Sequence, residues 1–248
     1  MVITSRILQD RLGIDPFIAD YFANQRPVPP DNLFWKDKRI YLSMGFGFLT
    51  IPFAIDLMNK CGISREILLH DEHVGRMEQG FDLLKKYELK SITLDEFIKG
   101  CQELLNNQIR QPRLAQDLFS LFTGDKPAYF QFETTYQALA RSDFFLFTLV
   151  DLSVTDEWVE QFLPNWYTLA RPILLLDDFR DIEEDRLNGE ENTIIELGDD
   201  KAAVLKAYEM GKSDLGKLAD INQPLSDFIQ ELLDDSMQYA PIQRILAD

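Results

Sequence analysis

Carboxylates are concentrated in one short stretch in the last third of the chain. Residues 173–188 read ILLLDDFRDIEEDRLN, so an apolar run is followed at once by acids. The acids are Asp177, Asp178, Asp181, Glu183, Glu184 and Asp185. In a helix, side chains four residues apart lie on one face, so Asp177, Asp181 and Asp185 would form a single column. Towards the N-terminus the same face continues as Ile173, Ala170, Trp166 and Phe162.

Like charges at this spacing repel each other, and the column costs stability unless a cation lies beside it. Carboxylate oxygens suit Mg2+, which binds through a few carboxylates, several waters and the phosphates of a substrate. The pattern therefore predicts a magnesium site for a phosphorylated substrate. The alternative is an acidic helix end that is simply solvated.

Composition narrows the range of partners. The chain has 248 residues, 46% of them hydrophobic, and a net charge of −17. Such a charge argues against nucleic acid, because phosphate backbones bind basic surfaces. The most apolar stretch, residues 41–55, is too short and too interrupted to span a membrane. Two cysteines without metal-type spacing and a start without a secretory pattern lead us to expect a cytoplasmic protein.

Apolar periodicity predicts helices nearly throughout and no strand pair. Start and stop signals mark the ends of individual helices. Thr93 to Glu96 form a capping box, a helix begins at Pro112, and Asn188-Gly189 ends the acidic helix. Predicted helices cover residues 4–24, 36–60, 63–87, 93–107, 112–124, 129–152, 155–188, 199–219 and 223–240. We therefore expect one all-α domain over residues 1–248, built as a bundle of about ten helices.

The acidic helix resembles the second metal-binding motif of the all-α isoprenoid synthase superfamily, which includes class I terpene synthases and trans-prenyltransferases. Acids occupy all three ligand positions of the terpene-synthase spacing, and the run from Asp178 to Asn192 is similar to the corresponding helix of the bacterial large-terpene-synthase group. The resemblance implies a fold with a central cavity and a Mg2+-dependent enzyme, a lyase or transferase, that ionises an allylic isoprenoid diphosphate. Asp177, Asp181 and Asp185 would be catalytic metal ligands, with Asp178 beside them as a further candidate.

The opposite metal-binding wall of this family is only partly matched. Residues 68–72 read LLHDE and resemble the start of the first prenyltransferase motif, which implies that Asp71 and Glu72 bind metal. Its third acid would fall at Gly75. The incomplete motif favours a terpene-synthase-like enzyme over a chain elongator, and leaves cyclisation and elongation both open.

Basic and aromatic residues near these motifs are candidates for substrate binding. The family binds the diphosphate with basic side chains, for which Arg186 and Arg141 are candidates, and shelters the carbocation with aromatic rings. Arg141 could equally pair with Asp143. The candidate rings are Trp166, Phe144, Phe145 and Phe147.

Two other interpretations stay open at this point. Glu66, His70 and His73 would share one face of a helix over residues 63–87, as in a helical metal-dependent oxygenase. Two surface histidines near acids explain the same pattern. The chain could also be a non-catalytic binding protein that kept the isoprenoid-synthase fold and lost one acidic wall. The resemblance further implies a homodimer.

Overall fold

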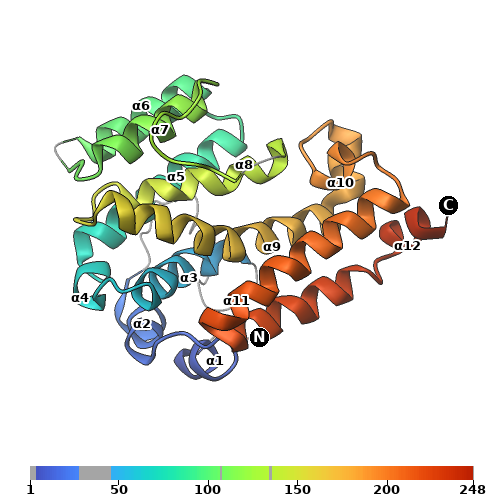
Figure 1. Ribbon diagram of the computed structural model, residues 1–248, viewed down its shortest axis with the longest axis horizontal. Coiled ribbons are helices and arrows are strands. Elements are labelled where there is room, and N and C mark those ends of the chain that lie inside the picture. The colour runs from blue at the N-terminus through green and yellow to red at the C-terminus, as the bar shows by residue number, and fades with distance from the viewer. Residues whose placement is uncertain (1–3, 28–45, 107, 134–135, 248) are drawn as a thin grey trace. The chain divides into compact units, whose positions relative to one another are not determined.

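The computed structural model describes residues 4–27, 46–106, 108–133 and 136–247 (Figure 1). Every regular element in these ranges is a helix and no strand occurs, which confirms the predicted all-α class. The chain forms two compact units, each described by itself below. The first comprises Met1–Asp10, Ile14–Gln131 and Phe145–Phe162, and the second Arg11–Gly13, Phe132–Phe144 and Leu163–Asp248. A single domain over residues 1–248 stays a prediction.

The first unit contains the N-terminal helices and the start of α9. Its elements are α1 (Ser5–Asp10), α2 (Pro16–Asp20), a π-helix (Tyr21–Gln25), α3 (Phe46–Lys60), α4 (Arg65–Leu68), α5 (Asp71–Glu88), α6 (Leu94–Leu105), α7 (Pro112–Phe122) and a 3-10 helix (Phe145–Leu149). Helix α3 covers the second half of the predicted apolar helix, and residues 36–45 lie outside the described ranges. The helix α6 has the predicted capping box at Thr93 and Glu96, and α7 begins at Pro112 as predicted.

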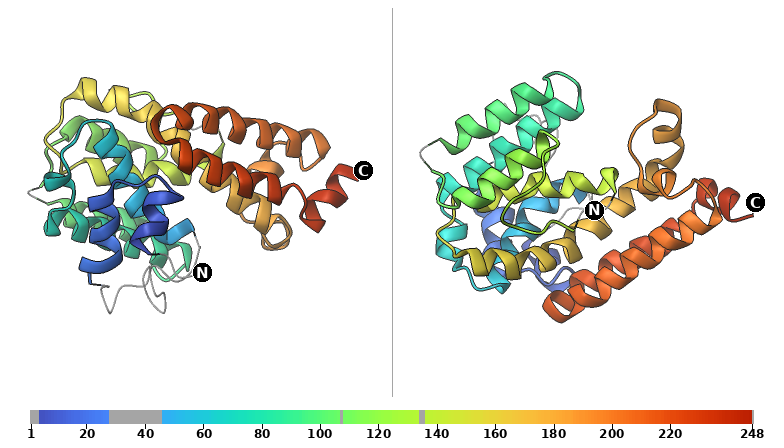
Figure 2. Two further views of the ribbon diagram at one scale, coloured as in Figure 1. Left: turned by 90° about the horizontal axis from the view of Figure 1, so that it is seen from below. Right: turned by 45° about the horizontal axis from the view of Figure 1, so that its top comes forward.

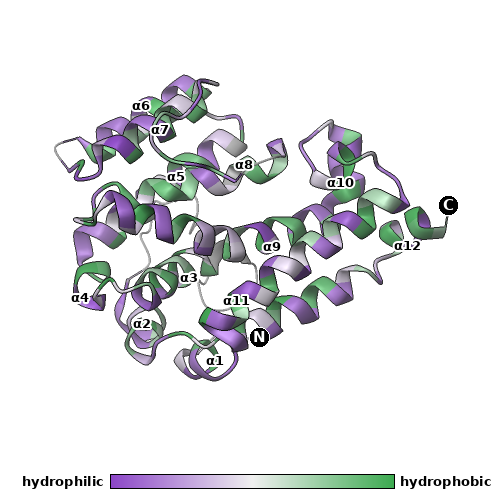
Figure 3. Ribbon diagram, in the orientation of Figure 1, coloured by the Kyte–Doolittle hydropathy of each residue, from purple (hydrophilic) through white to green (hydrophobic). Residues whose placement is uncertain are grey.

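Amphipathic faces account for the packing of α6 and α7. Hydrophobic and hydrophilic residues alternate along both helices (Figure 3). The buried face of α6 consists of Phe97, Cys101 and Leu105, which recur four residues apart. Helix α6 packs mainly on α5, where Phe81 is only 3% exposed.

Two predicted helices were wrong in extent, one within the first unit and one that spans both units. The helix predicted over residues 63–87 is interrupted, because α4 ends at Leu68 and α5 restarts at Asp71 with His70 as its N-cap. The helix predicted over 129–152 begins only at Gln137. Its expected first turn is instead held by the buried carboxylate of Asp117, which accepts the backbone N–H groups of residues 128–130 at 2.7–2.8 Å.

The second unit contains the helix with the acidic column. Its elements are α8 (Gln137–Phe144), residues 163–188 of α9 (Asp156–Asn188), α10 (Thr193–Glu196), α11 (Lys201–Ser236) and α12 (Ala240–Ala247). Helix α9 ends at Asn188, and Gly189 follows with φ +67°, as predicted from the Asn-Gly pair. Helix α12 and the one-turn α10 were not predicted.

A break divides α11 into two arms. Asn222 has non-helical φ and ψ of −150° and 83°, and the arms on either side run back along each other (Figure 2). The arms pack closely at Gly211, because a Cβ at this position would lie 2.8 Å from the side chain of Leu233. The two predicted helices 199–219 and 223–240 correspond to these arms.

The described helices differ from membrane-spanning helices. None of them combines the length and the apolarity that a transmembrane span requires.

Candidate functional site

The predicted carboxylate column lies on one continuous helix. Thr155 caps α9, since its hydroxyl accepts the backbone N–H of Trp158, and the helix then runs for 33 residues. The stripe that leads to the column is buried at Phe162, Trp166 and Ala170, which are 2%, 2% and 6% exposed. Ile173 is half-buried. The acids then emerge: Asp177 and Asp181 are exposed and Asp185 is half-buried.

The carboxylates of the column influence one another electrostatically. Partial burial, followed by repulsion from Asp177, Asp185 and Glu184, raises the pKa of Asp181 above its ordinary value of 3.8, and Arg180 opposes the shift. The column thus concentrates negative charge at its middle residue. A divalent cation at this face would relieve the repulsion.

Asp178 differs from the exposed acids of the column. It is 1% exposed, and its carboxylate accepts the backbone N–H of Thr193 at 3.0 Å. Its backbone carbonyl accepts the side-chain amide of Asn192 at 2.8 Å. The structure therefore gives this predicted metal ligand a role in joining the end of α9 to the start of α10.

The side-chain amide of Asn192 also reaches the column itself. Its Nδ2 donates to Oδ2 of Asp185 at 2.8 Å. The chain turns back after Gly189, where the N–H of Glu190 bonds to the carbonyl of Asp185 at 2.9 Å, and this brings Asn192 alongside the helix. Sequence reasoning did not assign a role to Asn192, because the contact depends on that turn.

The acids of the predicted first wall lie in the first unit, at the N-terminus of α5. Asp71 is 85% exposed in its side chain and accepts Nη1 of Arg26 at 2.8 Å. Glu72 lies 3.7 Å from Nη1 of Arg76. Both carboxylates are therefore paired with arginines. They belong to the first unit, and the column belongs to the second.

The predicted substrate-binding rings are distributed over both units. Phe145 stacks on Phe81 with ring centroids 4.7 Å apart, and Phe147 packs against Phe119 and Phe122 at 5.0 and 5.1 Å, all within the first unit. In the second unit, Phe144 is half-buried.

Trp166 is fixed in the interior of the second unit. Its indole N–H donates to the carbonyl of Ser142 at 3.1 Å. Trp166 precedes the column on the buried stripe of α9, so of the four rings it is the one on the same helix face as the acids.

The histidine interpretation of the sequence needs correction. Glu66 lies on α4, His70 caps α5 and His73 lies inside α5, so the three do not share one face of one helix. His73 is 3% exposed rather than a surface residue, and its Nδ1 lies 3.0 and 3.1 Å from the carboxylate oxygens of Asp151.

Asp151, the partner of His73, also forms an ion pair with Arg76. Burial opposes ionisation of Asp151, but hydrogen bonds and charge from His73 and Arg76 outweigh it and lower the pKa of that carboxyl. Nε of Arg76 donates to Asp151 at 2.7 Å. Within the described residues, no group of three or more His, Cys, Asp or Glu side chains is arranged to hold a metal ion.

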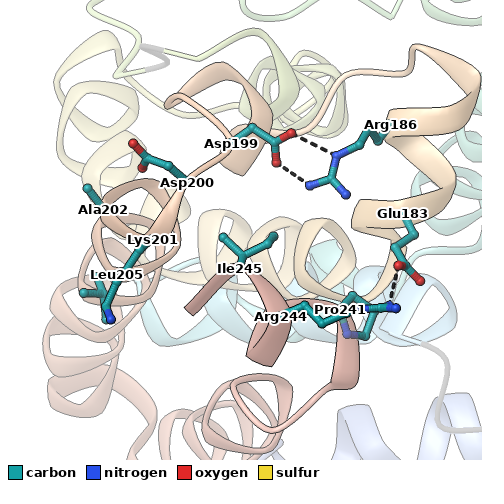
Figure 4. Close-up of a pocket in the computed structure, with 10 residues that line it drawn as sticks. All are labelled: Glu183, Arg186, Asp199, Asp200, Lys201, Ala202, Leu205, Pro241, Arg244 and Ile245. Atoms are coloured by element: carbon teal, nitrogen blue, oxygen red, sulfur yellow. Dashed lines mark hydrogen bonds and ion pairs between the residues drawn. The ribbon is translucent and has the colours of Figure 1, made fainter. Parts of the chain in front are cut away.

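An open groove of about 970 Å³ lies in the second unit at the end of α9 (Figure 4). It contains Arg186, one of the two predicted diphosphate-binding cations. The lining residues are Glu183, Arg186, Asp199, Asp200, Lys201, Ala202, Leu205, Pro241, Arg244 and Ile245. Lys201 and Arg244 are cations that sequence reasoning missed, because they lie on α11 and α12 and line the groove only through the tertiary fold.

The cations of this groove are engaged by the protein itself. Nε of Arg186 donates to Asp199 at 2.9 Å, Arg244 pairs with Glu183, and Nζ of Lys201 donates to a backbone carbonyl at 2.9 Å. At 100° per residue, Glu183 and Arg186 point about 160° and 140° away from Asp181 around the helix. The groove is therefore separate from the carboxylate column. Arg141 lies on α8, and its side chain is outside the described part of the chain.

The chain was compared with known proteins. No family model, curated protein or solved structure matches it.

Proposed function

We propose that the carboxylate column of α9 binds Mg2+ and, through it, the diphosphate of an allylic isoprenoid substrate. The observation that carries the proposal is the geometry of Asp177, Asp181 and Asp185. The three acids follow one another at single-turn spacing on one helix, beyond the end of the buried stripe. Partial burial, and then repulsion from the neighbouring acids, raises the pKa of the middle one. The resemblance to the second motif of isoprenoid synthases supports the substrate class.

The donor set fits Mg2+. The ion prefers oxygen ligands and retains several waters, so one or two carboxylates and the phosphates of the substrate suffice. Exposed Asp177 and Asp181 leave room for those waters and phosphates. Since no three candidate ligands among the described residues form a metal-holding group, the proposal requires the phosphates of the substrate to complete the coordination.

The residues of this helix would bind the cation, fix the end of the helix and provide an apolar surface beside the substrate. Asp177, Asp181 and Asp185 would hold the cation, and Asp178 fixes the end of the helix on which they lie. When bound, the ion would neutralise the negative charge that develops on a departing diphosphate. The buried stripe of α9 that ends at Ala170 supplies an apolar neighbour on the same face. The incomplete first acidic motif favours a terpene-synthase-like enzyme over a chain elongator, and both cyclisation and elongation stay open.

Release of pyrophosphate tests the enzymatic proposal. The protein is incubated with Mg2+ and geranyl, farnesyl or geranylgeranyl diphosphate, and pyrophosphate release is measured. We expect Asp177→Ala to reduce the rate at least about a hundredfold, as is typical when an electrostatic stabiliser of a transition state is removed. Glu160→Gln is the matched control, because it removes an exposed acid from the first turns of the same helix. Equal rates in wild type and Asp177→Ala would contradict the assignment.

A non-catalytic binding protein is the second candidate. The pairing of Asp71 with Arg26 and of Glu72 with Arg76 favours it, because arginine-bound carboxylates are poor partners for a second metal cluster. This candidate predicts that magnesium pyrophosphate binds without turnover of any prenyl diphosphate. Turnover of any prenyl diphosphate by wild type would exclude this second candidate. If turnover occurs, Glu72→Ala tests the first wall: a large loss of rate supports catalysis with two walls, and an unchanged rate removes Asp71 and Glu72 from the site.

A further inference from the structure

We propose that the Asn188-Gly189 pair is a site at which the chain modifies itself, by deamidation through a cyclic imide. It is the only Asn-Gly pair in the sequence, and it lies at the end of α9 in the second unit. The attacking group in this reaction is the backbone nitrogen of the residue after asparagine, which a glycine leaves sterically open. A Cβ placed on Gly189 would meet nothing within 4 Å, so this nitrogen is also open to approach in the folded chain.

The reaction needs no reagent other than hydroxide and water. Hydroxide removes the proton from the backbone nitrogen of Gly189, and this nitrogen attacks the side-chain carbonyl carbon of Asn188. A new carbon–nitrogen bond closes the imide ring, the bond to the amide nitrogen breaks, and ammonia leaves. Water then adds to one of the two ring carbonyls and breaks its bond to the ring nitrogen. Opening at one carbonyl leaves aspartate, and opening at the other leaves isoaspartate, in which the backbone runs through the former side chain.

The protein holds neither of the reacting groups. Asn188 and Gly189 are both exposed. Within the described chain, nothing accepts a hydrogen bond from the N–H of Gly189, and nothing bonds to the side-chain amide of Asn188. Attack requires Asn188 to rotate out of its helical conformation, which the backbone bond from Glu190 to the carbonyl of Asp185 at 2.9 Å opposes. This bond lies at a helix end, where local opening costs little free energy, so the rotation is accessible without unfolding of the unit.

Other asparagines of the described chain lack this combination. The Nδ2 of Asn24 donates to a carboxylate at 2.6 Å, and that of Asn59 donates to a backbone carbonyl at 2.9 Å. Asn192 and Asn222 are only 1% and 5% exposed. Each of these four is followed by a residue with a side chain, which shields the attacking nitrogen.

Deamidation would change both the charge and the backbone of this helix end. A carboxylate at position 188 lies one turn after Glu184, so it forms a like-charged pair there, and it lies at the negative end of the helix dipole. Isoaspartate also inserts an extra carbon into the backbone just before the turn at Gly189. That turn brings Asn192 alongside α9, where its Nδ2 donates to a carbonyl of the helix at 2.8 Å. Both products therefore weaken the connection between α9 and α10.

Incubation of the purified protein, followed by peptide mapping with mass spectrometry, tests the site. We expect Asn188 to deamidate at least about tenfold faster than Asn24, because the attacking nitrogen is already adjacent and unshielded. The rate should be higher at alkaline than at acidic pH, since the nitrogen must lose its proton, and isoaspartate should appear beside aspartate. Asn188→Gln is the matched control, because its longer side chain would have to close a larger ring and should stay intact. Asn188→Asp reproduces one product and should unfold at a Tm about 1–4 °C below that of Asn188→Gln.

Each outcome bears on the proposal. If Asn188 stays intact in the folded protein but deamidates after unfolding in urea, the helix end protects it and the proposal is overturned. Equal rates at Asn188 and Asn24 overturn it as well, because the glycine would then have no effect. Rapid, alkali-dependent formation of isoaspartate at position 188 supports the site, and equal Tm values for the two variants would overturn the effect of the new charge. None of these outcomes depends on cation binding, so this proposal and the proposed function can fail separately.

Discussion

Asp181→Asn is expected to stabilise the metal-free protein while removing its response to Mg2+. Asp181 has like-charged neighbours four residues before and after it, at Asp177 and Asp185. Each such pair on an exposed helix face costs about 0.2–0.5 kcal/mol, so neutralising the middle residue should gain roughly 0.4–1 kcal/mol. In a protein of this size that corresponds to an increase in Tm of about 1–4 °C. Salt screens exposed charges, so the gain should shrink at high ionic strength.

The pH dependence of this gain follows from the direction of the shift. The pKa of Asp181 is raised in the folded state above its ordinary value of 3.8, so the folded protein disfavours the ionised form. The penalty is fully present at pH 7 and disappears as the pH falls through the folded and then the unfolded pKa. Wild type and Asp181→Asn should therefore differ at neutral pH and converge below about pH 3.8.

Thermal unfolding at low salt, with and without Mg2+ and pyrophosphate, measures both effects. A ligand that binds only the folded state at a hundred times its Kd stabilises by about 2.7 kcal/mol. Wild type should show such an increase in Tm and Asp181→Asn should not, so that their order of stability reverses. Glu160→Gln, on the same helix, should respond as wild type does. An Asp181→Asn protein that is no more stable than wild type without ions, or that responds equally to them, would refute a crowded cation-binding column.

Two further predictions concern the framework and can be checked by urea unfolding. Gly13→Ala should lose at least about 1–2 kcal/mol, because φ is +61° there and an added Cβ would lie 2.2 Å from Oδ1 of Asn222. Gly216→Ala is its control, since a Cβ there meets nothing within 4 Å and replacing a helical glycine should gain about 0.4–1 kcal/mol. Asp117→Asn should lose about 2–3 kcal/mol, because the buried carboxylate accepts three backbone N–H groups between residues 128 and 130 and an amide oxygen binds them less strongly. A loss below 0.5 kcal/mol at either Gly13 or Asp117 would contradict these assignments.

Local signals in the sequence predicted much of the fold. The capping box at Thr93, the proline at position 112 and the Asn-Gly pair at 188–189 act within one helical turn, and the structure confirms each boundary. The errors have non-local or ambiguous causes. The start of α8 was missed because Asp117, on another helix, binds the backbone N–H groups of residues 128–130. The break before α5 was missed because His70, an unusual N-cap, carries no strong stop signal.

The candidate site was likewise predictable where it depends on local spacing and unpredictable where it depends on the tertiary fold. The column of Asp177, Asp181 and Asp185 was predictable because spacing alone determines which residues share a helix face. The separation of Arg186 from the column was predictable in principle from the same periodicity. The pairing of Arg186 with Asp199 was not predictable, and neither was the presence of Lys201 and Arg244 in the groove. These residues come from the loop before α11 and from α11 and α12.

The surroundings of Asp185 bear on the choice between a cation site and a solvated helix end. A solvated acid gains little from a buried neutral donor, because water already satisfies its oxygens and the protein must order the donor at an entropic cost. Here the chain turns at Gly189 and uses a residue that is 1% exposed to hold one carboxylate of the column, while the neighbouring Asp181 is left in mutual repulsion. Under the proposed function, the hydrogen bond from Asn192 would hold the carboxylate of Asp185 in a fixed direction before a cation arrives with the substrate.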